Sequence, residues 1–183
     1  SSDLSRLAPR IVTTAVVLFS IYSALTLACG LSYYWAGMQA FDAVSHAFST
    51  VAIGGFSTKD ASIGYWDSPA IEGVAMVFMV LAGLNFALHF ASYKSLRSTL
   101  SPNYNRARSW PSISHYWKDT EAKGYFIFLA ILSVVVIGVL YQSDTYGFTE
   151  ALRKGAFETI SIATTTVFAT ADYSLWPTFL PFL

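Results

Sequence analysis

Long apolar runs separated by short polar stretches divide this chain, as expected for helices that cross a membrane. Residues 11–31 contain no charged side chain, and at about 1.5 Å per residue their helix matches a hydrocarbon core of roughly 30 Å. Apolar runs over 70–93 and 125–141 predict two more spanning helices. A further apolar run begins at 177–183, where Pro recurs as it does before the run over 70–93. The pattern predicts an integral membrane protein.

Two shorter amphipathic segments, 41–53 and 153–163, are too short to cross. The first has apolar side chains at three- and four-residue spacing, and as a helix it reaches only about 20 Å. Each segment is followed by a loop, over 54–66 and 164–176, that is rich in Gly, Ser or Thr near its start. We predict two re-entrant hairpins, since non-helical backbone at membrane depth is tolerated only where protein buries it or it lines a watery cavity.

The two hairpins contain copies of one motif. Residues 49–58 have the sequence STVAIGGFST, and residues 161–170, 112 positions further on, have the sequence SIATTTVFAT. A ring of carbonyl ligands is built by repeating one unit around an axis, so the repeat favours a pore. The residues expected to bind a cation through backbone carbonyls are Ala52, Ile53, Gly54, Gly55, Thr164, Thr165, Thr166 and Val167. The hydroxyls of the three threonines are further oxygen ligands in this interpretation.

These residues resemble a known family over nearly the whole chain. Residues 49–62 resemble the second pore loop, and 161–177 the third, of the Trk/Ktr/HKT potassium-transporter superfamily, most closely a bacterial Trk-type potassium-translocating subunit. The resemblance implies an all-α integral membrane fold. In this fold, units of helix, re-entrant pore helix, filter loop and helix form a pseudo-tetrameric cation pore. The second unit is then 1–93, and most of the third is 125–183.

The resemblance also implies the ion, the location and the partners. It implies that K⁺ is the transported ion and that the protein is a multi-pass protein of the bacterial cytoplasmic (inner) membrane, surrounded by lipid. It further implies a homodimer associated with a cytosolic nucleotide-binding regulatory subunit. Gly55 is consistent with family members that select potassium over sodium.

Val167 departs from the family pattern, which has Gly at the corresponding filter position. A β-branched residue resists the positive φ that such a position needs. We therefore expect the protein either to bear strain at Val167 or to turn the Val167 carbonyl away from the axis. In the second case an ion would lose one ligand.

Composition and charge add topology to this interpretation. Of the 183 residues 54% are hydrophobic and 12% are charged, with a mean hydropathy of +0.48, far from the values of a soluble domain. The formal net charge is zero, so nothing favours a nucleic-acid partner. Segment 94–124 contains six basic and two acidic residues, which by the positive-inside rule predicts a cytoplasmic linker and filter loops outside. The chain does not begin with Met, so we expect a piece of a longer polypeptide.

Polar and aromatic residues near the apolar segments have structural interpretations beside functional ones. His46 either senses pH near neutrality or packs against a neighbouring helix. Asn85 and His89 share a helix face and are expected to form hydrogen bonds between helices. Asp42 lies in the first turn of its helix, where a negative charge suits the helix dipole. Residues 33–35, Tyr-Tyr-Trp, indicate an aromatic belt at the outer interface.

No arrangement typical of an enzyme is present, so we predict that the chain is not one. No Ser/His/Asp set, His/Glu metal cluster or carboxylate pair falls within a span. The single Cys29 excludes an intrachain disulfide. A second hypothesis is a non-conducting membrane scaffold or assembly subunit with degenerate pore loops, which Val167 favours.

Overall fold

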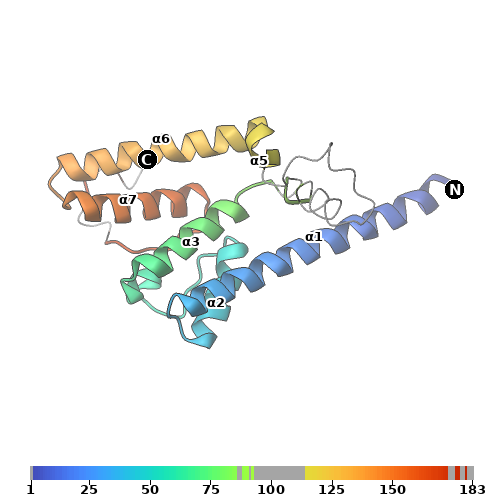
Figure 1. Ribbon diagram of the computed structural model, residues 1–183, viewed down its shortest axis with the longest axis horizontal. Coiled ribbons are helices and arrows are strands. Elements are labelled where there is room, and N and C mark those ends of the chain that lie inside the picture. Colours follow the sequence, from blue (N-terminus) through green and yellow to red (C-terminus); the bar gives the residue numbers. More distant parts are fainter. Residues whose placement is uncertain are drawn as a thin grey trace.

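The computed structural model describes residues 2–85, 88–90, 92, 114–172, 176, 177 and 180. All regular structure in these residues is helical, which confirms the all-α class. The helices are α1 (Ser2–Trp35), α2 (Ala40–Val51), η1 (Ser62–Trp66), α3 (Pro69–Ala82), α5 (Ser114–Lys118), α6 (Thr120–Gln142) and α7 (Phe148–Ala163). In Figure 1, α2 lies along the C-terminal part of α1, α7 lies beside α6, and α3 lies between these two pairs. Most of the predicted linker over 94–124 and of the predicted run over 177–183 falls outside the described residues.

Local capping explains where the short helices and α6 begin and end. α2 ends at Val51, two residues before the predicted boundary, since Ile53 adopts a left-handed conformation with φ 55° that no α-helix accommodates. α7 begins five residues before the predicted boundary of 153, with Glu150 in its first turn at the positive end of the helix dipole. α6 begins at Thr120 because the carboxylate of Asp119 accepts a hydrogen bond of 2.9 Å from the backbone N–H of Ala122.

The helix predicted over 70–93 is interrupted, and this prediction is wrong in its extent. α3 ends at Ala82, eleven residues before the predicted end, and residues 88–90 are helical again. A Cβ on Gly83 would lie 2.4 Å from the hydroxyl oxygen of Tyr125, so α6 packs directly against the break. The carbonyls released there have partners: the Tyr125 hydroxyl donates to Val80 O at 3.4 Å, and His89 Nε2 lies 2.9 Å from Leu81 O.

Asn85 and His89 form the expected hydrogen bonds to other helices, but Asn85 lies in the break and does not share a helix face with His89 as predicted. Asn85 Nδ2 donates to Glu121 Oε2 on α6 at 3.3 Å, and His89 Nδ1 lies 2.8 Å from the Tyr116 hydroxyl on α5. The break in the apolar run is therefore tied by polar side chains to the two helices that follow the linker.

The aromatic belt predicted over 33–35 is wrong for Tyr33. Its side chain is fully buried against α2, and its hydroxyl lies 2.8 Å from Thr50 Oγ1. Tyr34 and Trp35 are exposed, in keeping with an interface. The composition of the triplet is that of a belt, but the helical period turns one of the three rings inward.

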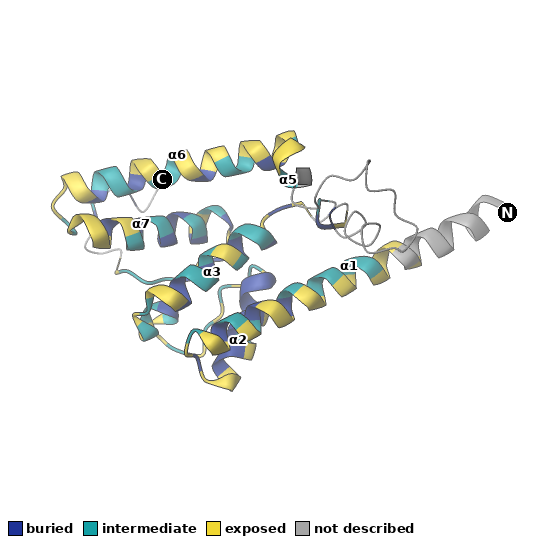
Figure 2. Ribbon diagram, in the orientation of Figure 1, coloured by how far each residue is buried: buried dark blue, intermediate teal, exposed yellow. Residues whose placement is uncertain are grey.

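Apolar side chains also cover much of the outside of the molecule. Thr14–Trp35 and Thr120–Gln142 are long and apolar enough to span a membrane, and only 11% and 17% of their most apolar windows are buried. Figure 2 shows exposed residues along α6 and along the described side chains of α1. Such a surface is typical of contact with lipid or with further protein.

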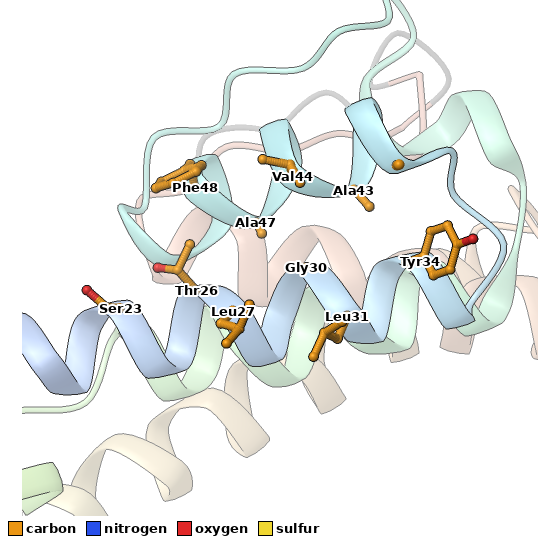
Figure 3. Close-up of a pocket in the computed structure, with 11 residues that line it drawn as sticks. Ser23, Thr26, Leu27, Gly30, Leu31, Tyr34, Ala43, Val44, Ala47 and Phe48 are labelled. Atoms are coloured by element: carbon orange, nitrogen blue, oxygen red, sulfur yellow. The ribbon is translucent and has the colours of Figure 1, made fainter.

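An apolar groove of about 630 Å³ lies between α1 and α2 (Figure 3). Leu27, Leu31 and Tyr34 line it from α1, and Val44 and Phe48 line it from α2. The two helices are close together at the floor of the groove, where a Cβ on Gly30 would be in ordinary van der Waals contact with Cβ of Ala47, at 3.5 Å.

Candidate functional site

The two predicted filter loops have the same backbone conformation at matching positions. After α2, Ile53 and Gly55 have φ of 55° and 65°; after α7, Thr165 and Val167 have φ of 63° and 62°. Ala52 and Thr164, which precede them, are right-handed, and the residues between them do not have a positive φ, so the sign of φ alternates in both loops. This alternation turns successive peptide groups to the same side, which gathers N–H groups on one side and carbonyls on the other. The sequence repeat at an offset of 112 is therefore also a repeat in conformation.

Val167 bears strain in the backbone and does not escape the left-handed region. Its φ differs by only 3° from that of Gly55, the residue at the matching position. Of the two outcomes expected from the sequence, the structure has the first. Left-handed backbone at a β-branched residue costs about 1 to 3 kcal/mol and persists only where the surroundings fix it. Here the Val167 N–H donates to Ser161 O at 3.1 Å, which ties the strained residue back to α7.

The structure brings the two loops into direct contact. A Cβ on Gly55 would lie 1.9 Å from the carbonyl oxygen of Thr166 and 3.4 Å from the carbonyl carbon of Val167. Only Gly therefore fits at position 55, both because of its φ and because the second loop occupies the space. The sequence predicted the first reason but not the second, since loop-to-loop contact has no local signal.

Two of the three threonine side chains in the second loop are buried. Thr164 Oγ1 and Thr166 Oγ1 lie 2.9 Å apart, and both side chains are buried. Thr164 Oγ1 also donates to Ser161 O at 3.3 Å. These two hydroxyls thus form hydrogen bonds with each other and with the end of α7, and their role as cation ligands stays a prediction. Backbone carbonyls remain the oxygen atoms that both loops have in common.

Polar side chains on α2 hold the loop that follows it. Thr58 Oγ1 donates to Asp42 Oδ1 at 2.6 Å, and Lys59 Nζ lies 3.5 Å from Asp42 Oδ2. These contacts, the Thr58 hydrogen bond first, hold the pKa of the Asp42 carboxyl below its ordinary value, so that it is ionised at neutral pH. Asp42 therefore anchors the loop in addition to its position in the first helical turn.

His46 is fully buried behind the first loop, with both ring nitrogens occupied. Nδ1 lies 2.8 Å from Asp42 O, and Nε2 lies 2.9 Å from Ser57 Oγ. A carbonyl only accepts, so Nδ1 carries the proton and Nε2 accepts from Ser57 in the neutral ring. The ring also contacts Trp66 and Phe168, at centroid distances of 5.1 and 5.9 Å. These contacts favour the packing interpretation of His46 over the pH sensor.

Glu158 holds the second loop from the corresponding position of α7. It lies 112 residues after His46 and is fully buried. Its Oε1 accepts hydrogen bonds from the N–H and the hydroxyl of Thr170, at 2.5 and 3.0 Å, and from the N–H of Ala171 at 3.0 Å. Sequence reasoning did not select Glu158 as a site residue. The repeat offers the missing signal, because it places two polar residues at the same turn of two amphipathic helices.

Hydrogen bonds and an ion pair also join the two repeats near the loops. Gly64 N–H donates to Ala169 O at 3.0 Å, and Ala169 N–H donates to Ser62 Oγ at 3.2 Å. Arg153 on α7 forms two hydrogen bonds with the carboxylate of Glu72 on α3, at 2.6 and 2.8 Å. Such a bidentate pair fixes orientation as well as distance. The relative position of the two loops is thus set by contacts between the loops themselves and by the Arg153–Glu72 pair outside them.

Comparison with known proteins identifies relatives over nearly the whole chain. The family model described as TrkH, cation transport protein, matches residues 5–183. The chain is 45% identical over 179 residues to the Trk system potassium uptake protein TrkH of Halomonas elongata, and 40% identical over 180 residues to that of Escherichia coli K12. Each alignment covers 98% of this chain and 34% of the relative, so the chain spans about a third of the relatives' length.

A solved structure has the same fold. The crystal structure of the potassium transporter TrkH from Vibrio parahaemolyticus aligns with a TM-score of 0.83 and 41% sequence identity. The alignment covers 95% of this chain and 35% of that chain.

Proposed function

The chain belongs to the TrkH family of cation transport proteins, and we propose that residues 52–55 and 164–167 form two sides of a potassium filter made of backbone carbonyls. The observation that carries this proposal is the matching alternation of backbone conformation in two loops that touch each other. Carbonyls gathered on one side of each loop replace the hydration shell of an ion that passes between them. The reaction is transport of K⁺ across the membrane rather than catalysis.

The remaining sides of the filter belong to further repeats of the whole protein. Phe168 is fully buried against the first repeat, whereas Phe56, at the matching position, is 82% exposed. A further repeat that packs against the first repeat of this chain, as the first packs against the second, would cover Phe56. The same repeat would cover apolar surface on α2, including Phe41 and Phe48, which are 74% and 55% exposed. This incomplete packing supports a ring of four similar units.

The resemblance to Trk-type proteins and the names of the relatives support the finer parts of the proposal. The whole protein is a potassium uptake protein of the bacterial cytoplasmic (inner) membrane. It acts as a homodimer associated with a cytosolic nucleotide-binding regulatory subunit. Filter loops at the outer face and the basic segment 94–124 at the cytoplasmic face follow from the charge asymmetry.

The scaffold hypothesis loses its main support. Val167 favoured it, but φ at Val167 lies within 3° of φ at Gly55, so the backbone does not depart from the first loop in this angle.

Substitution of Gly55 tests the proposed filter in the full-length protein. Gly55→Ala places a methyl group against the Thr166 carbonyl, whereas Gly73→Ala on α3 meets no atom within 4 Å and serves as the control. We expect Gly55→Ala to lower the ratio of K⁺ to Na⁺ uptake on the order of tenfold, the effect of about 1.4 kcal/mol in relative ion binding. Uptake is measured in potassium-transport-deficient cells at matched membrane abundance. An unchanged ratio in both variants would remove Gly55 from the filter.

A further inference from the structure

The geometry points to Glu158 as a positioning residue that fixes the outer limb of the second loop, residues 168–171, and thereby sets ion selectivity. This inference rests on the proposed function, because selectivity has meaning only if the loops form a filter. Glu158 is not one of the proposed carbonyl ligands. It acts through the loop backbone that it holds.

Glu158 and Ser161 together attach the outer limb to α7. Three donors on two consecutive residues, Thr170 and Ala171, converge on Glu158 Oε1. Ser161, three residues further along α7 and so on the same face, donates from Oγ to Phe168 O at 2.7 Å. Both side chains are fully buried. A carboxylate that accepts backbone N–H bonds out of water makes stronger hydrogen bonds than a neutral group does.

η1 holds the same limb from the other side. Ala169 exchanges hydrogen bonds with Gly64 and with Ser62, at 3.0 and 3.2 Å. A Cβ on Gly64 would lie 3.1 Å from Cα of Thr170, so the two segments are packed backbone to backbone. The limb is therefore held between α7 and η1 and cannot shift without breaking several bonds.

This fixation explains how the loop keeps its strained conformation. Thr165 and Val167 are both β-branched and both left-handed, and such residues persist only where their surroundings over-determine them. The loop is bounded by the end of α7 on one side and by the limb on the other. If the limb is released, relaxation of Thr165 and Val167 toward ordinary φ values reorients the carbonyls between them.

In the first repeat, the residue that matches Glu158 also supports its loop, but with a different side chain. His46, at the matching helix position, binds Ser57 Oγ, whereas Glu158 binds backbone N–H groups directly. A side chain at this turn of the pore helix thus supports the loop in both repeats. In the second repeat it is an acceptor for the backbone itself.

The test compares Glu158→Ala with Glu158→Gln in the full-length protein. Gln keeps an oxygen at the same place, so we expect it to retain the K⁺ to Na⁺ uptake ratio within about threefold. Ala removes all three hydrogen bonds, and we expect a decrease on the order of tenfold, as for the loss of one hydrogen bond to a charged group. Glu150→Gln is the control, since Glu150 is an exposed carboxylate on α7 that pairs with Lys154 at 3.2 Å.

A milder variant keeps the test decisive if Glu158→Ala does not reach the membrane. Thr170→Val removes only the hydroxyl donor at 3.0 Å, and we expect it to lower the ratio by about twofold to threefold. An unchanged ratio in Glu158→Ala, or in Thr170→Val where the Ala variant is absent, overturns the inference. An equal decrease of the ratio in Glu158→Ala and Glu158→Gln also overturns it, because that result would assign the effect to the charge of Glu158. If Gly55→Ala changes the ratio and Glu158→Ala does not, only this inference fails; if neither does, the filter itself fails.

Discussion

Replacing Val167 by Gly isolates the strain in the second loop. Val167 has φ 62° and a side chain that is 64% exposed, so the change removes a left-handed β-branched residue and little buried surface. The relief is about 1 to 3 kcal/mol. Two costs oppose this relief. The added Gly loses more backbone entropy on folding, which costs about 0.5 to 1 kcal/mol. The buried third of the Val side chain is also lost, which costs about 0.5 to 1 kcal/mol. These terms nearly cancel, and we expect a stability equal to or slightly above that of the unmodified protein.

Val134→Gly supplies the comparison that reveals the strain. Val134 lies in α6, is 70% exposed and is not left-handed, so its replacement carries the same costs with no strain to relieve. The thermal midpoint of the detergent-solubilised full-length protein should therefore fall for Val134→Gly and not for Val167→Gly. The difference between the two variants corresponds to about 2 kcal/mol. Equal decreases at both positions would mean that Val167 is unstrained. The K⁺ to Na⁺ uptake ratio of Val167→Gly should remain unchanged, since the left-handed φ of Val167 is already that of Gly55.

Two further predictions concern topology and the contact between repeats. Cysteine introduced at Asp60 should react with a membrane-impermeant reagent from outside, and cysteine at Lys118 only from inside; labelling of both from one face would contradict the hairpin topology. Arg153→Leu leaves the buried Glu72 carboxylate without its bidentate partner and should destabilise the protein by about 3 kcal/mol, whereas Lys154→Ala, which removes a partly exposed pair, should cost less than about 0.5 kcal/mol in the same thermal assay. An Arg153→Leu protein as stable as Lys154→Ala would show that the pair does not hold the repeats together.

The sequence repeat predicted where the loops lie but not how Val167 would behave. The offset of 112 residues aligned Val167 with Gly55 in the sequence repeat, and the two residues have matching φ values. Local preference opposed the left-handed conformation, and it was overridden by hydrogen bonds between the loop and α7. The Ser161 carbonyl binds Val167 N–H, and Glu158 holds the limb that follows. The sequence pattern shows that these residues are near one another along the chain, but it does not show which of their atoms form hydrogen bonds.

The break after α3 was missed for a related reason. Hydropathy stays high through Gly83 and Leu84, so the apolar run gives no sign of interruption. The end of the helix is set by Tyr125, 42 residues further on, which fits against Gly83, and by the His89 ring at Leu81 O. Apolar length predicts which segments enter a membrane, whereas a helix break depends on partners that length does not register.

A ring built from unequal repeats of one chain distributes strain differently from a ring of identical subunits. In a homotetramer, a Val at the position of Gly55 would impose its left-handed cost four times and would require four clamps. In the two loops of this chain the cost at this position arises at Val167 and not at Gly55. Glu158 accepts three hydrogen bonds from the loop that contains Val167, whereas the loop that contains Gly55 is supported by the neutral His46. Divergence between repeats therefore allows one side of the filter to depart from Gly wherever its own pore helix supplies the compensating hydrogen bonds. The side chain behind a loop and the residue within it are expected to change together.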